Sequence, residues 1–188
     1  TPCGTLFPYT TLFRSVTSVA QYKGNTYIST LEGLYYLKPY VLESLNDKHM
    51  AIPIESVKQS CWSFSKIQGK LFVNTIEGIY QITGEKAKPV LEDRFVFTLK
   101  ESEIFPGKVL IGLRQGLLIA DFKINPSGEA VFKNIYNVEE VNSRILEMIE
   151  TLPNRIWLGT HTEGLQLLEF SGNGLKNHTL TRFGQENG

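Results

Sequence analysis

Short runs of consecutive apolar residues recur along the chain, and each run is bounded by glycine or by polar turn residues. Such runs stand at 27–28, 71–73, 109–111 and 156–158. Because these apolar residues do not alternate with polar ones, the runs indicate strands that are covered on both faces. A small residue follows each run, as expected where another backbone approaches closely. The pattern predicts an all-β chain of short strands and tight turns.

The apolar runs belong to a unit that occurs four times. The copies are KGNTYISTLEGLYYL from Lys23, QGKLFVNTIEGIYQI from Gln68, PGKVLIGLRQGLLIA from Pro106 and PNRIWLGTHTEGLQLL from Pro153. A glycine or asparagine in the pair that opens each copy would supply the positive φ that a tight hairpin needs. The second glycine of each copy stands at 33, 78, 116 and 164, so the spacing corresponds to one supersecondary unit per repeat.

Each unit supplies two strands, and the flanking segments supply two more. The upstream candidates are 15–22, 60–67, 94–101 and 143–150, and the downstream ones are 50–57, 88–93, 130–136 and 177–183. The segment 143–150, SRILEMIE, has helix propensity, but its place in the repeat predicts a strand. Four antiparallel strands per repeat are typical of β-propeller blades. We expect about four consecutive blades, at roughly 16–57, 58–93, 94–138 and 141–184, from a larger ring.

The first fifteen residues need a separate interpretation. The segment 5–15, TLFPYTTLFRS, matches at every position the in-frame translation of a common short-read sequencing adapter. We therefore expect residues 1–15 to be an adapter-derived scar, and the native propeller domain to cover 16–188. Cys61 is then the one native cysteine, which we expect to be a small buried apolar residue rather than a nucleophile or ligand.

Composition and motifs narrow the function classes. The chain has 19 basic and 19 acidic residues, so no basic excess indicates a nucleic-acid partner. No apolar run approaches the length of a membrane-spanning helix. The sequence lacks the nucleophile-elbow, phosphate-loop and zinc motifs, so we expect no catalytic residue, no metal and no cofactor. His49 and His178 fall in a loop or outer strand, where we expect them to be solvated.

The repeat resembles the two-component regulator propeller family. The likeness is carried by RIWLGTHTEGLQLLEF, with its core at Ile156, Trp157, Gly159, Thr160, Gly164 and Leu165. The first two copies keep a Thr-x-Glu-Gly turn at 30–33 and 75–78. The third copy departs from it, with Leu-Arg-Gln-Gly at 113–116, and only the fourth copy has the tryptophan.

The resemblance implies the sensor region of a hybrid two-component or triple-tyrosine-type receptor. Such a region is non-catalytic, senses a ligand, and lies in the periplasm or outside the cell as part of a membrane protein. Its implied partners are a small molecule, for which family analogy favours a carbohydrate, and the remaining blades and output domains of the same chain. The full-length form could pair as a homodimer. Because both ends look cut within a ring, we expect the fragment to self-associate.

Propeller topology places the candidate site. Loops between second and third strands, and loops leading into first strands, share one face around the central channel, and loops on a rigid scaffold often carry recognition. The candidate ligand-binding residues are Arg114, His161, Thr162, Trp62, Arg144 and Glu163. Arg114, His161 and Thr162 rank first because they break the repeat. The residues assigned to turn structure are Thr30, Glu32, Gly33, Thr75, Glu77, Gly78, Gln115, Gly116, Gly159, Thr160 and Gly164.

Two alternatives stay open. One is a propeller enzyme of lyase type, which would place a compact acid, base or metal cluster on the channel face. The other is a protein-interaction scaffold that binds no small ligand.

Overall fold

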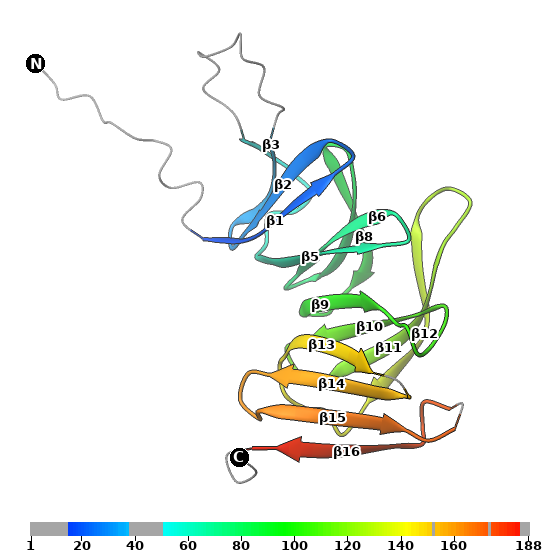
Figure 1. The fold of residues 1–188 in the computed structure, drawn as a ribbon. Coiled ribbons are helices and arrows are strands. Elements are labelled where there is room, and N and C mark those ends of the chain that lie inside the picture. The colour runs from blue at the N-terminus through cyan, green and yellow to red at the C-terminus, as the bar shows by residue number, and fades with distance from the viewer. Residues whose placement is uncertain (1–14, 38–50, 152, 173, 185–188) are drawn as a thin grey trace, which may run out of the picture.

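The computed structural model describes residues 15–37, 51–151, 153–172 and 174–184. Within these ranges the chain consists of sixteen strands and no helix (Figure 1). No described segment is a helix of the length and apolarity needed to cross a membrane. Of the adapter-like segment only Ser15 is described, and the rest of that segment and His49 lie outside the described residues.

The strands form four antiparallel sheets, each built from four consecutive strands. Blade 1 contains β1 (Val16–Tyr22), β2 (Asn25–Thr30), β3 (Gly33–Leu37) and β4 (Ala51–Pro53). Blade 2 contains β5 (Cys61–Ile67), β6 (Lys70–Thr75), β7 (Gly78–Thr83) and β8 (Lys86–Glu92). Blade 3 contains β9 (Val96–Glu101), β10 (Lys108–Leu113), β11 (Leu117–Ile124) and β12 (Ala130–Val138). Blade 4 contains β13 (Ile145–Thr151), β14 (Arg155–Thr160), β15 (Leu165–Phe170) and β16 (His178–Phe183).

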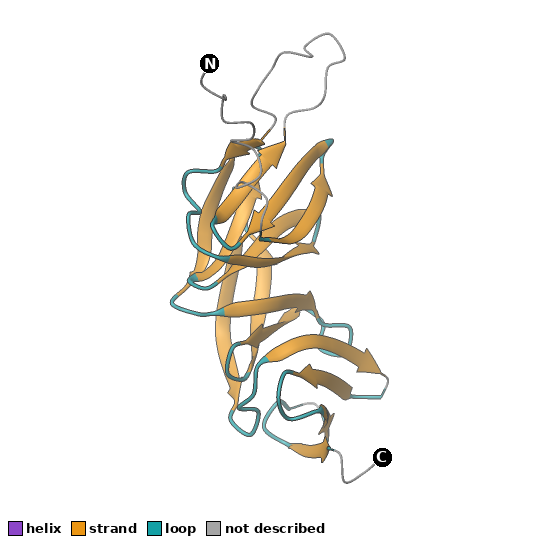
Figure 2. Ribbon diagram, turned by 90° about the vertical axis from the view of Figure 1, so that its left-hand side faces the viewer, coloured by secondary structure: helices purple, strands orange, loops and turns teal. Residues whose placement is uncertain are grey.

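This architecture confirms the predicted all-β propeller fold, including the strand β13 where helix propensity competed. The sheets stack in chain order, and blades 1 and 4 lie at opposite ends of the stack (Figure 1). Figure 2 shows the same stack from the side, with every sheet twisted. First strands of consecutive blades pack together, β1 on β5, β5 on β9 and β9 on β13, so the first strand is the inner one.

The cores lie between neighbouring blades. Phe72 and Val73 are adjacent in β6, yet Val73 packs toward blade 1 and Phe72 toward blade 3, and both are fully buried. Successive side chains of a strand point to opposite faces, so a strand between two blades needs apolar residues at consecutive positions. Burying each of these side chains stabilises the fold by about 2–3 kcal/mol.

Blade 4 departs from this rule on one face. Ile156 and Leu158 of β14 are fully buried against blade 3, whereas Trp157 between them is only half-buried. On the same face as Trp157, Ile149 of β13 is 55% exposed and Leu165 of β15 is 44% exposed. Blade 4 therefore presents an apolar face that the described residues leave largely uncovered.

The tight hairpins adopt the expected positive φ, but not at the expected residues alone. Lys23 and Gly24 have φ values of 49° and 80°, and Gln68 and Gly69 have values of 45° and 71°. Both two-residue loops therefore have positive φ throughout, as in a type I′ turn, which matches the twist of the joined strands. The residue before each glycine adopts the left-handed conformation as well, which the sequence did not indicate.

At Gly112, the small residue after the apolar run of blade 3 has a different reason from the one expected. A Cβ at Gly112 would lie 2.6 Å from the Thr98 Cγ2 atom and 3.0 Å from the Ile145 Cβ atom. The crowding there comes from side chains of two inner strands and not from an approaching backbone.

Cys61 is buried as expected. Its side chain is fully buried, and burial raises the pKa of the thiol to about 12. The thiol is therefore protonated at neutral pH and is a packing group.

His178 corrects the expectation of a solvated histidine. Its side chain is only 4% exposed, with Nε2 2.9 Å from the Glu140 carboxylate and Nδ1 2.9 Å from the Leu175 carbonyl oxygen. The rings of Tyr136 and Phe170 flank it. His178 therefore joins the outer strand of blade 4 to the end of blade 3.

Candidate ligand-binding site

In each blade, a hydrogen bond joins the turn between the second and third strands to the start of the inner strand. In all four blades a turn amide donates to the carbonyl oxygen of the residue just before the inner strand, at 3.0–3.2 Å. The pairs are Leu31 with Ser15, Ile76 with Ser60, Arg114 with Phe95, and His161 with Arg144. These hydrogen bonds bring the two kinds of loop to one edge of each sheet.

A β-bulge stands at the same place in every inner strand. The register shifts between the first and third residues of β1, β5, β9 and β13, and the residue between them is left unpaired. The bulged residues are Thr17, Trp62, Phe97 and Leu146. A bulge changes the direction of the side chain of the extra residue. This edge therefore carries a row of four residues that have no partner on the neighbouring strand.

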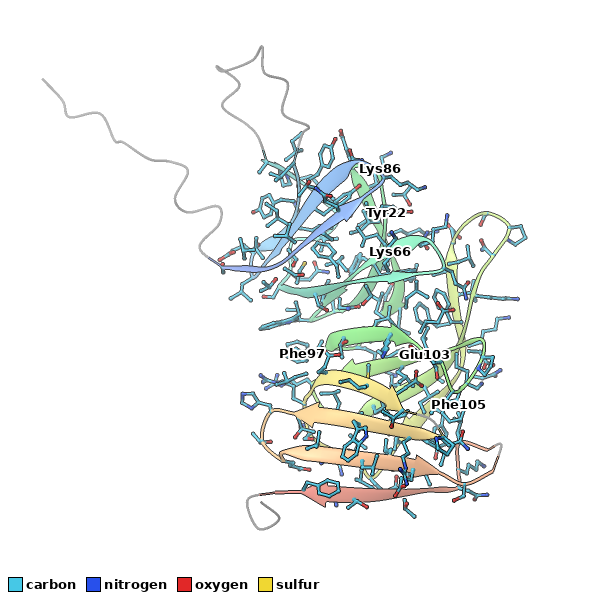
Figure 3. All side chains as sticks on the ribbon, in the orientation of Figure 1. Tyr22, Lys66, Lys86, Phe97, Glu103 and Phe105 are labelled. Atoms are coloured by element: carbon cyan, nitrogen blue, oxygen red, sulfur yellow. The ribbon has the colours of Figure 1, made fainter. Side chains whose placement is uncertain are left out.

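Three aromatic rings gather at this edge where blades 2 and 3 meet. The ring of Trp62 lies 4.9 Å from that of Phe97 and 5.8 Å from that of Phe95, measured between centroids. Phe95 and Phe97 stack at 4.8 Å with an interplanar angle of 13°. Figure 3 shows Phe97 at the start of β9, at the opposite end of that strand from Glu103 and Phe105.

Two arginine side chains lie over these aromatic rings. The guanidinium carbon of Arg114 lies 5.7 Å from the Phe95 ring centroid, and that of Arg144 lies 4.9 Å from the Phe97 centroid. Cation–π contacts of this kind contribute about 0.5–1 kcal/mol each at exposed positions. We call the group of Trp62, Phe95, Phe97, Arg114 and Arg144 the aromatic–arginine cluster.

The polar atoms of the cluster are incompletely paired among the described residues. No ion pair there includes Arg114 or Arg144. The indole Nε1 of Trp62 is buried and has no hydrogen-bond acceptor in the described part of the chain. A buried donor that stays unpaired costs about 1–3 kcal/mol, so this N–H group is a position where a water molecule or a ligand oxygen would be stabilising.

The remaining candidate residues lie at the blade 4 turn. His161 and Thr162 are exposed, and among the described residues no ring contact or cation–π contact joins their side chains to the cluster. The Glu163 carboxylate accepts a hydrogen bond from Gln166 Nε2 at 2.7 Å and lies 3.5 Å from Arg182 Nε. Glu163 is thus held inside blade 4, whereas Trp62, Arg114 and Arg144 come together.

The threonines of the repeated turns act on their own backbone. Thr75 Oγ1 donates to the Gly78 carbonyl oxygen at 3.0 Å and accepts from the amides of Glu77 and Gly78 at 3.1 Å. Equivalent bonds join Thr30 to Glu32 and Gly33, and Thr160 to Glu163 and Gly164. The Glu32 carboxylate also accepts a bond from the Ser15 hydroxyl.

The glycines that end these turns fit a crowded backbone. A Cβ at Gly78 would lie 1.9 Å from the Leu91 carbonyl oxygen, and one at Gly164 would lie 2.5 Å from the Phe183 carbonyl oxygen. Both glycines also have positive φ, at 147° and 66°. These residues shape the edge that carries the cluster.

Sequence reasoning missed Phe95 and Phe97. The available signal was the aromatic pair in RFVF, at the position where the first two copies hold serine before the inner strand and threonine or tryptophan at the bulge. The bulge that turns Phe97 out of the ladder depends on strand register, and single-sequence patterns do not reveal it.

The described residues contain no group of three or more histidine, cysteine or acidic side chains able to hold a metal ion. The cluster instead combines ring faces with planar cations. Such a surface can stack against an apolar ring face and donate hydrogen bonds to oxygen atoms at its edge.

Among the comparisons with known proteins, the one with solved structures supports the fold. No family model and no curated protein matches the chain. Among solved structures, the chain is similar to the extracellular domain of BT4673 from B. thetaiotaomicron, described as a hybrid two-component system, at 19% identity and a TM-score of 0.56. That match covers 92% of this chain and 23% of that one. A second structure of the BT4673 extracellular domain, described as a one-component system, matches at 18% identity and a TM-score of 0.56, over 89% of this chain and 21% of that one. The chain thus spans less than a quarter of the length of these structures, and it shares its fold with part of the extracellular domain of BT4673.

Proposed function

We propose that the chain is a non-catalytic, ligand-sensing part of the extracytoplasmic receptor region of a two-component-type signal transduction protein. The fold shared with the extracellular domain of BT4673 supports the placement outside the cytoplasm. The observation that carries the ligand-binding role is the aromatic–arginine cluster, which joins residues from three blades at one edge.

The cluster suits a ligand that has an apolar ring face and oxygen atoms around it. Sugar rings have this shape, since their axial C–H groups make one face apolar while the hydroxyls lie at the rim. The side chains of Trp62 and Phe95 are half-buried and so retain some exposed surface for contact with a ligand. A carbohydrate is therefore the ligand class that the proposal favours.

Signalling requires that the bound and free states differ in a way the rest of the receptor can detect. The cluster spans blades 2, 3 and 4, so a ligand seated on it would favour one relative placement of these blades. Under this proposal the remaining blades and the output domains of the same protein are the partners that receive the change, and a homodimer of the full-length receptor is one form in which they could act.

A thermal-shift screen of the chain against neutral and acidic oligosaccharides tests the proposal. We expect at least one saccharide to raise the melting temperature in proportion to its concentration, because a ligand that binds only the folded state stabilises it. Trp62→Ala should abolish the shift, whereas Trp157→Ala, in blade 4, should preserve it. A screen in which no saccharide shifts the melting temperature, or in which Trp62→Ala keeps the shift, contradicts the proposal.

A further inference from the structure

We infer that the ligand of the aromatic–arginine cluster is an anion: a ring compound whose carboxylate or sulfate group is bound by Arg114 and Arg144. This inference rests on the proposed function, since it specifies the chemistry of the ligand at the same site.

The arginines of blades 3 and 4 differ in the groups that they contact. Arg155 and Arg182 lie beside carboxylates, at 2.8 Å from Glu169 and 3.5 Å from Glu163 respectively. Arg114 and Arg144 instead lie over aromatic rings, with no carboxylate partner among the described residues. A guanidinium that stacks through its face keeps its five N–H donors at its edge. Two sets of donors are therefore available beside the stacked rings.

The fold does not require a cation at position 114 or 144. The backbone bond between the turn and the start of the inner strand is the same in all four blades, at 3.0–3.2 Å. In blades 1 and 2 the donors of this hydrogen bond are the amides of Leu31 and Ile76, which stand at the position that Arg114 occupies in blade 3. They hold Ser15 and Ser60 where blade 4 holds Arg144. Because the same turn forms with uncharged residues, its folding does not account for either arginine.

The acidic residue of the repeated turn pairs with neither of these two arginines in blades 3 and 4. In blades 1 and 2 the residue before the turn glycine is an acid, Glu32 or Glu77, whereas in blade 3 that residue is Gln115. The carboxylate that would partly offset Arg114 is thus replaced by a neutral amide. The Glu163 carboxylate of blade 4 is engaged by Gln166 and Arg182. Among the described residues, no carboxylate forms an ion pair with Arg114 or Arg144 at this edge.

The aromatic–arginine cluster combines cationic groups with aromatic rings. Arginine recognises carboxylate and sulfate groups through parallel N–H···O bonds, which are about twice as strong as bonds between neutral groups. The half-buried rings of Trp62 and Phe95 lie beside the buried ring of Phe97, with the three centroids 4.8–5.8 Å apart, so a small apolar surface is exposed at Trp62 and Phe95. A ligand with a ring face and an anionic substituent would satisfy both parts of the cluster at once.

Calorimetric titration of the chain with matched ligands tests the inference. The ligands are digalacturonate, the neutral disaccharide of the same skeleton, a sulfated disaccharide and benzoate. We expect an anionic ligand to bind at least about tenfold tighter than the neutral disaccharide at low salt, and added NaCl should reduce that advantage. Arg114→Gln and Arg144→Gln should each weaken anion binding by about tenfold or more, since each variant removes charge-assisted hydrogen bonds to the anion.

Two controls separate site recognition from general charge attraction. Arg155→Gln removes a cation at the far end of β14, where Arg155 pairs with Glu169, and should leave affinity unchanged. The lysine variants Arg114→Lys and Arg144→Lys keep the charge and should recover part of the affinity, and an unchanged melting temperature checks that the glutamine variants remain folded.

The outcomes distinguish the inference from the proposed function. Equal affinity for the neutral and the acidic disaccharide, lost in Trp62→Ala, overturns the inference and leaves ligand sensing intact. No binding by any of the four ligands overturns the inference, and only a thermal-shift screen in which no saccharide raises the melting temperature overturns the proposed function as well. An anion preference that Arg155→Gln reduces as much as Arg114→Gln also overturns the inference. Binding of benzoate alone supports it and identifies an aromatic acid, rather than an acidic saccharide, as the source of the ligand.

Discussion

The Arg144 guanidinium of blade 4 lies over the Phe97 ring of blade 3, with 4.9 Å between the guanidinium carbon and the ring centroid. The two residues come from different repeats and meet because each stands at the start of an inner strand. Trp62 of blade 2 contacts the same ring at 4.9 Å. One phenylalanine therefore links three blades at the edge where a ligand could bind, and its position depends on the bulge in β9.

Gly78→Ala should destabilise the chain by about 3 kcal/mol or more. Its φ is 147°, and the added Cβ would lie 1.9 Å from the Leu91 carbonyl oxygen, so both strain and overlap oppose the alanine. Gly69→Ala is the matched control, because that glycine has a φ of 71° but no atom within 4 Å of the added Cβ. It should cost about 1 kcal/mol. Urea unfolding compares the two, and equal losses would show that the backbone contact is not limiting.

Thr75→Val should cost about 1–3 kcal/mol, because it removes a buried hydroxyl that serves three hydrogen bonds within one turn. Thr75→Ser keeps the hydroxyl and should lose much less. If valine and serine variants have the same free energy of unfolding, the turn does not depend on this hydroxyl.

Glu140 should stabilise the fold in a pH-dependent manner. The hydrogen bond from His178 lowers the pKa of the Glu140 carboxyl below its ordinary value of 4.5. A carboxyl with a depressed folded-state pKa contributes stability above its unfolded pKa, and this contribution disappears as the pH falls through the lowered value. The difference in unfolding free energy between wild type and Glu140→Gln should therefore shrink from pH 6 to pH 3.

His178→Phe is the control for this pH dependence, since it keeps a ring between Tyr136 and Phe170 but removes the bond to Glu140. In that background Glu140→Gln should have little effect at any pH. A pH-independent difference between wild type and Glu140→Gln would mean that the carboxylate contributes nothing through its charge.

The exposed face of blade 4 should tolerate polar substitution. Ile149 is 55% exposed, so Ile149→Thr should change the melting temperature little and should reduce self-association, measured by sedimentation at high concentration. Leu158, fully buried on the opposite face of the same sheet, provides the contrast. Leu158→Ala should cost about 2–5 kcal/mol. Unchanged self-association in Ile149→Thr would show that this face does not mediate it.

Repeat spacing was sufficient to predict the blades, because hydrophobic runs and turn glycines recur wherever one sheet must pack between two others. It even placed a strand at 143–150 against local helix propensity. The clustering of Trp62, Arg114 and Arg144 was only partly accessible: topology put them on one face, but their common partners, Phe95 and Phe97, depend on bulge register and on contacts between blades. The burial of His178 was missed for the same reason, since its partner Glu140 belongs to a different blade.

The most direct test of the central claim is the fluorescence of Trp62. The chain contains two tryptophans, so a Trp157→Phe variant reports Trp62 alone. If the aromatic–arginine cluster is the ligand site, titration with a saccharide that raises the melting temperature should shift or quench this emission in a saturable manner, with the affinity found by calorimetry. Saturable binding without any change in Trp62 emission would place the ligand elsewhere and contradict the account.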